Sequence, residues 1–281
     1  MEKNQEISYQ EKLNTAFQYL QKTLLLKPEI LLILGSGLGG FTDHLSIIQT
    51  VPFSAIPYFP TTQVVGHQST LVLAKYLETP LLIMKGRNHY YQGFTDEEMR
   101  LPLQLFALLG VNKLINTNAC GGMNPTFQPG DIMLIEDHIN MMGRNPLNGD
   151  NLDSIGPRFF DMSEPYDQKW IQMVQKIAVN HKILLQKGVY VSYFGPNYET
   201  KAEIKAFRQL GGDAVGMSTV PEVLVARHAG MRVLGLSVIT NMSTGLSEKQ
   251  LSHDEVIEVS SRVSKNLSTL LQEFIKHINN S

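Results

Sequence analysis

The chain alternates short apolar runs with longer stretches in which apolar residues recur at helical spacing. The short runs are almost wholly apolar, which is typical of strands that helices cover on both faces. They predict strands over Ile30–Leu34, Thr70–Ala74, Leu81–Lys85, Lys113–Asn118, Asp131–Asp137, Gly188–Phe194, Ala214–Met217 and Arg232–Thr240.

The amphipathic stretches lie between and after these runs. Strands that alternate with helices of this length indicate βαβ units and a mostly parallel sheet. One segment, "LVLAKYLETPLLIM", is interpreted instead as a hairpin that turns at Glu78-Thr79-Pro80, so the sheet is expected to be mixed. Helices are predicted over Asp96–Leu109, Gln168–His181, Ala202–Leu210, Val223–His228 and Asp254–Ile278.

No repeat, low-complexity tract or linker divides the 281 residues. We therefore expect a single domain over residues 1–281, with residues 1–27 as an N-terminal helical extension. The longest predicted loop, Gly143–Ser163, is rich in Gly, Pro, Asn and Asp, and loops of this length are usually functional.

Composition narrows the range of partners. A net charge of −2 without a basic block argues against a nucleic-acid surface. No apolar run approaches the roughly 20 residues of a membrane span, and the eight histidines form no metal-type pair. The single cysteine, Cys120, and the polar N-terminus indicate a reducing compartment. We expect a cytoplasmic protein with no nucleic-acid or membrane partner.

A glycine-rich loop follows the first predicted strand, in "ILLILGSGLGGF". Its spacing satisfies G-x-G-x-x-G, but a dinucleotide site also needs an acidic residue about 20 positions later. The stretch at that distance, "TVPFSAIPYFPTTQ", contains no acid, which argues against a nicotinamide or flavin cofactor. Two interpretations stay open: a phosphate loop, with backbone N–H groups and the Ser36 hydroxyl as donors, or a turn without a ligand.

A second anion-binding stretch is "MKGRNHYYQGF". Arg87, His89 and Tyr91 alternate, so in extended backbone they point the same way. Arg offers a planar fork for oxyanions, and His adds a donor that titrates near neutral pH. The alternative is a surface loop whose charged side chains are only solvated.

Two further loops follow strands in the same manner. In "TNACGG" the backbone around Ala119 supplies N–H groups, and in "GMSTVPE" Ser218 precedes a helix that carries Pro221 in its first turn. Ser218 fits an anion site or an ordinary helix cap. Because such loops share one rim of an α/β sheet, we expect these groups to converge with Ser36, Arg87 and His89 on one oxyanion.

Residues suited to a planar heterocycle follow two other strands. Tyr198 offers a stacking surface and Glu199 a carboxylate acceptor, and Asn241 can donate and accept at once. Glu199 could instead favour a helix dipole, and Asn241 could be an ordinary loop residue.

Together, "GSGLGG", "GRNHYYQG", "TNACGG", "FGPNYET", "VGMSTVPEVLVARHAGMRV" and "ITN" resemble, in order and spacing, the trimeric class of purine nucleoside phosphorylases. The resemblance covers about residues 28–275. It implies the nucleoside-phosphorylase α/β fold, a homotrimer, and a pentosyltransferase of purine salvage. No metal or organic cofactor is implied, since inorganic phosphate is a co-substrate.

The resemblance also assigns site residues by function. Asn241, Glu199 and His89 are implied in catalysis. Ser36, Arg87, His89, the Ala119 backbone and Ser218 match the phosphate pocket; Tyr91, Met217 and His253 match ribose contacts; and Tyr198, Glu199 and Asn241 match the base site. Phe159 matches the aromatic residue that the family supplies from a neighbouring subunit.

The implied reaction is reversible phosphorolysis of purine ribo- and deoxyribonucleosides to free base and the sugar 1-phosphate. Glu199 with Asn241 favours 6-oxopurines such as inosine and guanosine. The alternative within the family is a methylthioadenosine-type phosphorylase, which the polar His253 argues against. A non-catalytic nucleotide- or phosphate-binding protein is the alternative from another class. Departures from the family pattern are Tyr198 in place of Phe, Cys120 in place of a small residue, and a short Met242–Ser252 segment.

Overall fold

The structure, a computed structural model, describes residues 7–35, 38–61, 69–246 and 253–278, with backbone only for His44 and residues 253–255. Its strands are β1 (Ile30–Ile33), β2 (Ser46–Pro52), β3 (Thr70–Tyr76), β4 (Thr79–Lys85), β5 (Lys113–Gly122), β6 (Ile132–Asn140), β7 (Leu185–Ser192), β8 (Ala214–Gly216) and β9 (Arg232–Met242). Its α-helices are α1 (Tyr9–Thr23), α2 (Asp96–Leu108), α3 (Gln168–Asn180), α4 (Lys201–Gln209), α5 (Val220–His228) and α6 (His253–Ile278). Short 3₁₀ turns are η1 (Gly39–His44), η2 (Phe53–Ala55) and η3 (Tyr90–Gln92).

The strands form one mixed sheet in the order β2-β3-β4-β1-β5-β8-β7-β6-β9. β1 runs parallel to β4 and β5, whereas β2, β3 and β4 form an antiparallel meander. β9 pairs with β6 and also with β5, so β5, β8, β7, β6 and β9 close into a ring. The expected α/β architecture with a mixed central sheet is confirmed, and this closure is an addition that local sequence patterns do not encode.

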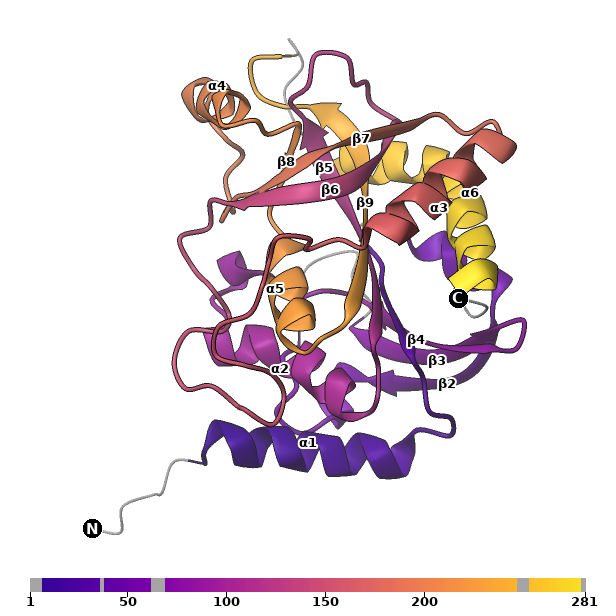
Figure 1. Ribbon diagram of the computed structural model, residues 1–281, viewed down its shortest axis with the longest axis vertical. Helices are drawn as coiled ribbons and strands as arrows, with labels where there is room; N and C mark the ends of the chain where they lie inside the picture. The colour runs from indigo at the N-terminus through magenta and orange to yellow at the C-terminus, as the bar shows by residue number, and fades with distance from the viewer. Residues whose placement is uncertain (1–6, 36–37, 62–68, 247–252, 279–281) are drawn as a thin grey trace.

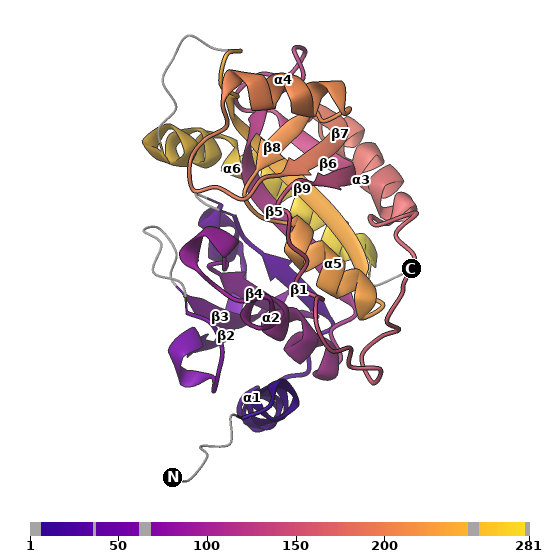
Figure 2. The same cartoon turned by 90° about the vertical axis from the view of Figure 1, so that its left-hand side faces the viewer.

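Helices cover the sheet in two groups (Figures 1 and 2). On one side α1 packs against α2, which packs against α5, and on the other α3 packs against α6. Trp170 of α3 and Phe274 of α6 meet edge to face in the core, with ring centroids 5.3 Å apart. α4 packs over β7 and β8 through Ile204 and Phe207, which belong to a smaller apolar cluster. Helices thus pack on both faces of the sheet.

Several element boundaries differ from the sequence-based expectations. Tyr76 pairs with Thr79, so the hairpin turns at Leu77-Glu78 rather than at Glu78-Thr79-Pro80, with Leu77 in the left-handed region at φ 54°. β2 was not predicted, because its side chains are largely exposed and show no apolar run. β5 continues to Gly122 instead of ending at Asn118, because its last residues pair with β8 and β9.

In the part of the chain that the structure describes, no helix is long and apolar enough to span a membrane. The same residues contain no group of three or more His, Cys, Asp or Glu arranged to hold a metal ion.

Candidate active site

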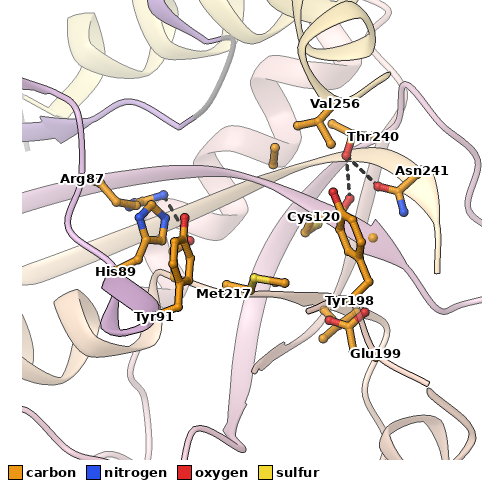
Figure 3. A pocket seen from close by; sticks show the side chains of 15 residues that line it. Arg87, His89, Tyr91, Cys120, Tyr198, Glu199, Met217, Thr240, Asn241 and Val256 are labelled. Atoms are coloured by element: carbon orange, nitrogen blue, oxygen red, sulfur yellow. Dashed lines mark hydrogen bonds between the residues drawn. The ribbon is translucent and has the colours of Figure 1, made fainter. Parts of the chain in front are cut away.

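A pocket opens where several strands end, and most of the predicted site residues meet there (Figure 3). β4 leads into Arg87 and His89, β8 into Met217 and Ser218, and β9 carries Asn241 near its end. The lining residues are Arg87, His89, Tyr91, Ala119, Cys120, Gly121, Tyr198, Glu199, Val215, Gly216, Met217, Ser218, Thr240, Asn241 and Val256. The pocket therefore combines residues that lie more than 160 positions apart in the sequence.

The pocket has two chemically distinct ends. Figure 3 places Arg87, His89 and Tyr91 together on one side and Tyr198, Glu199 and Asn241 on the other, with Met217 between them. The rings of His89 and Tyr91 stack, with centroids 4.7 Å apart. One end thus gathers a cation and hydrogen-bond donors, and the other gathers an aromatic ring, a carboxylate and a carboxamide.

Arg87 is the buried cation of the first end, with only 2% of its surface exposed. Its Nη1 donates to the Thr117 carbonyl at 2.9 Å and to the Ser218 hydroxyl at 3.3 Å. Ser218 can in turn donate its own proton, and its oxygen lies 3.3 Å from the Thr219 hydroxyl. Rotation of the Ser218 hydroxyl would offer its proton to an oxyanion in the pocket, beside the Nη1 group of Arg87.

The β5 backbone contributes through an unpaired edge. β1 pairs with β5 up to Asn116 and β8 pairs from Gly121, so between these points the described strands leave one side of β5 open. The Thr117 carbonyl points to that side, where it accepts from Arg87. Because backbone groups repeat their direction every second residue along a strand, the N–H of Ala119 points to the same side. The expected Ala119 donor is thus a strand edge and not a loop.

A strained turn presents Ser218. Thr219 has φ 73° and ψ −57°, and the Val220 amide donates to the Ser218 carbonyl at 2.8 Å. This is a γ-turn of the rare, strained kind, and a β-branched residue is unusual at its centre. The Asn118 side chain donates to the Thr219 hydroxyl at 2.9 Å and helps to hold it. The turn reverses the chain between β8 and α5 and leaves Ser218 in the pocket wall.

A glycine in the first rim loop permits close packing against β5. A Cβ on Gly35 would lie 2.7 Å from the Cα of Asn118, a backbone atom that cannot rotate away. The Gly35 amide donates to the Thr117 hydroxyl at 3.1 Å. The first glycine of "GSGLGG" therefore serves a close backbone approach, and Ser36, the predicted phosphate ligand beside it, lies outside the described residues.

A β-bulge directs Asn241 into the pocket. Cys120 pairs with Ile239 and Gly121 with Asn241, so Thr240 is the extra residue of β9. Bulges commonly re-aim side chains beside active sites, and here the adjacent Thr240 and Asn241 both line the pocket. The Thr240 hydroxyl donates to Asn241 Oδ1 at 3.0 Å. With its oxygen engaged in this network, the carboxamide of Asn241 presents its nitrogen as the donor.

The second end is polar but poorly solvated. Glu199 is 5% exposed, and burial is the main cause that raises the pKa of its carboxyl above the usual range. Tyr198 is 41% exposed and flanks it as an aromatic wall. Burial raises the pKa of Cys120 to about 12, so the thiol remains protonated and is no thiolate nucleophile at neutral pH.

The predicted site residues fall into three groups. Nine of them line the pocket: Arg87, His89, Tyr91, Ala119, Tyr198, Glu199, Met217, Ser218 and Asn241. Ser36 and the side chain of His253 lie outside the description, although the His253 backbone begins α6. Phe159 does not line the pocket; it lies between β6 and α3 with 91% of its surface exposed.

Sequence reasoning missed several residues that form the site, including two in the pocket wall and two behind it. Thr240 and Val256 line the pocket, and Asn116 and Glu222 contact Arg87 from behind it. Only Glu222 left a signal in the sequence, as an acid within the apolar stretch "VPEVLVA". A charged residue in such a stretch is rarely buried without a partner.

Comparison with known proteins identifies relatives over nearly the whole chain. The family model described as the phosphorylase superfamily matches residues 29–276. Purine nucleoside phosphorylase 1 of Geobacillus stearothermophilus is 46% identical over 263 residues, which cover 94% of this chain and 96% of that protein.

Two solved structures of Schistosoma mansoni enzymes are also similar. Purine nucleoside phosphorylase in complex with adenosine superimposes with a TM-score of 0.90 at 34% identity, covering 95% of this chain and 97% of that one. Isoform 2 of the enzyme, in complex with cytosine and ribose-1-phosphate, gives a TM-score of 0.89 at 38% identity, covering 95% and 96%. The chain belongs to the phosphorylase superfamily and, within it, to the purine nucleoside phosphorylases. The resemblance drawn from its motifs is thereby confirmed.

Proposed function

We propose that the chain catalyses the reversible phosphorolysis of purine ribo- and deoxyribonucleosides, with a preference for 6-oxopurines. The observation that carries the proposal is the two-ended pocket, in which donors around Arg87 lie across Met217 from Glu199 and Asn241. A phosphate at the first end and a base at the second would leave the sugar between them. The similar S. mansoni isoform 2, solved with a nucleobase and ribose-1-phosphate, supports this division.

The proposed reaction exchanges two bonds at the anomeric carbon. The bond from C1′ to the base nitrogen breaks with its electron pair going to the purine, and a phosphate oxygen forms a new bond to C1′. The transition state resembles an oxocarbenium ion, so an anion held beside the sugar stabilises it. Asn241 would donate to N7 as negative charge builds on the leaving base. Binding both substrates in this geometry supplies much of the remaining acceleration.

The proposed 6-oxopurine preference rests on hydrogen-bond polarity. An ionised Glu199 accepts a hydrogen bond from N1–H of hypoxanthine or guanine, whereas N1 of adenine carries no proton. His253, by its match to the family motif, is proposed to orient the ribose 5′-hydroxyl. The similar S. mansoni enzyme was solved in complex with adenosine, a 6-aminopurine nucleoside. Adenosine is therefore an informative second substrate for the assay described below.

The proposal also covers the co-substrate, the oligomeric state and the location of the enzyme. Inorganic phosphate is the co-substrate and no organic cofactor or metal is needed, because the positioned donors supply the charge stabilisation. We propose a homotrimer in which Phe159 of one subunit reaches the ribose site of the next. The 91% exposure of its side chain within one chain supports such a role. A cytoplasmic location, inferred from the single cysteine, is part of the same proposal.

The test is an assay of inosine with and without phosphate, in which hypoxanthine and ribose 1-phosphate are quantified. We expect release only with phosphate, and much slower turnover of adenosine. Turnover of methylthioadenosine without turnover of inosine would indicate the alternative specificity. Binding of inosine or phosphate without release of base would indicate a non-catalytic binding protein.

A further inference from the structure

A buried ion pair lies directly behind the pocket. Arg87 Nε donates to Glu222 Oε1 at 2.9 Å, and the two side chains are 2% and 8% exposed. Glu222 does not line the pocket; it lies in the first turn of α5, four residues after Ser218. Its carboxylate therefore acts on the pocket only through Arg87.

The placement of this carboxylate departs from the pattern in α2 and α4. Glu98 in α2 and Glu203 in α4 occupy the same third position, and each accepts from the backbone amide and hydroxyl of its own N-cap threonine. This is the capping-box arrangement. In α5 the N-cap Thr219, at the centre of the γ-turn, makes no side-chain hydrogen bond that caps the helix. The carboxylate of Glu222 faces Arg87 instead.

The contacts of Arg87 fix the plane of its guanidinium group. Nε bonds Glu222, Nη2 bonds the Asn116 side-chain oxygen, and Nη1 bonds the Thr117 carbonyl and the Ser218 hydroxyl. Asn116 is fully buried, and its Nδ2 donates to Glu222 Oε2 at 3.5 Å. The two side chains that accept from Arg87 are therefore also bonded to each other. Because a guanidinium group is planar, fixing Nε fixes the direction of both Nη groups.

We propose that Glu222 is a positioning residue for phosphate, which holds Arg87 so that its Nη1 group lies beside Ser218 in the pocket wall. The inference rests on the proposed function of the pocket as a phosphorylase site. The carboxylate also neutralises the buried guanidinium while the pocket is empty, since an unpaired buried charge is costly. Phosphate then meets an arginine that is already oriented, and little ordering is left to occur on binding.

Two variants at Glu222 separate the effect of side-chain length from the effect of charge. Glu222→Asp keeps the carboxylate but is one methylene shorter, so it loses the 2.9 Å contact with Nε. Glu222→Gln keeps the length and an acceptor oxygen but loses the charge. If positioning matters, Glu222→Asp raises the phosphate KM by at least about tenfold and Glu222→Gln by about threefold, with the inosine KM unchanged.

The matched control is Glu98→Gln, at the same position of α2, where the carboxylate only caps its own helix. Its phosphate KM should stay within about twofold of the unmodified chain. Calorimetric titration of each folded variant with inorganic phosphate alone gives affinities that do not depend on turnover. A phosphate affinity that falls in Glu222→Asp and not in Glu98→Gln supports the proposal.

Other outcomes overturn it. A larger loss in Glu222→Gln than in Glu222→Asp would assign the role to charge rather than to position, and unchanged phosphate affinity in both would make the pair purely structural. If Glu222→Asp fails to fold, the phosphate-bound structure of the unmodified chain decides, because the Arg87–Glu222 contact must persist there. Failure of the proposed function is distinct, since the unmodified chain would then show no phosphate-dependent turnover.

Discussion

The hydroxyl of Thr240 lies 3.0 Å from the side-chain oxygen of Asn241 and 3.2 Å from the carbonyl oxygen of Cys120. The bulge in β9 brings the two neighbouring side chains to one face, where alternation along a strand would separate them. The Thr240 hydroxyl contacts the oxygen of the Asn241 carboxamide, which leaves its nitrogen as the donor for the base in the proposed reaction.

Thr240→Val tests this relationship, because valine keeps the shape and removes the donor. Asn241 can then turn its oxygen toward purine N7, where it cannot donate. We expect kcat for inosine to fall about 5- to 10-fold, with the phosphate KM changed by less than about twofold. Thr15→Val in α1, whose hydroxyl bonds only the Glu11 carbonyl, is the matched control. Unchanged kcat in Thr240→Val would contradict the assignment.

Glu199→Gln should lower activity and raise stability together. A raised carboxyl pKa means that the folded chain binds this proton more tightly than the unfolded chain. The resulting stabilisation is present at low pH and is lost as pH rises through the folded-state pKa. At pH 7.5 the unmodified chain therefore carries an ionisation penalty that glutamine lacks, and the Tm of the unliganded variant should be higher.

The same substitution should change the pH profile. The unmodified chain should lose kcat/KM for inosine on acidification at a pH above the usual carboxyl pKa of about 4.3, because only ionised Glu199 accepts N1–H. Glu199→Gln should lack that acid limb and show kcat/KM lower by roughly 10- to 100-fold at neutral pH. An identical acid limb in both proteins would refute this role.

Gly35→Ala probes the close approach of the first rim loop to β5. The added Cβ meets the Asn118 backbone, so the loop must move, at a cost of about 1–3 kcal/mol in the free energy of unfolding. The phosphate KM should rise as well, because the proposed phosphate ligand Ser36 is the next residue in the sequence. Gly40→Ala is the control, since a Cβ there has nothing within 4 Å. Equal stability of the two variants by urea unfolding would contradict the packing argument.

Phe159→Ala tests whether this residue acts on another subunit. Within one chain the side chain is 91% exposed, so its loss should leave the Tm within about 1 °C. In the proposed trimer it removes an apolar contact to the neighbouring ribose, and the inosine KM should rise about tenfold. Val179→Ala on α3, also largely exposed, is the control. A fully active monomer in sedimentation and kinetic measurements would contradict the trimer.

The sequence predicted the existence and type of most elements because their apolar runs are long and clear. It placed the last four residues of one strand in a loop, since "TNACGG" is typical of a turn from its glycines. In the fold these residues pair with β8 and β9, and pairing partners about 90 and 120 positions away leave no local signal. Tertiary pairing overrode the local preference of glycine for turns.

Site residues were predictable where a polar or charged side chain follows a predicted strand, as Arg87, Ser218 and Glu199 do. It was not predictable where geometry depends on register or on a distant partner. The Thr240 bulge is defined only by pairing with β5, and the Glu222 contact joins residues 135 positions apart. The family resemblance supplied His253 and Phe159, whose residue types alone indicated no role.

The central claim is that one pocket holds phosphate at the Arg87 end and a purine at the Glu199 end. A crystal structure of the chain with inorganic phosphate and hypoxanthine tests it most directly. We predict an anion within hydrogen-bond distance of Arg87, Ser218 and the Ala119 amide, with the base against Tyr198 and its edge on Glu199 and Asn241. An anion bound elsewhere, or a base at the Arg87 end, would contradict the account.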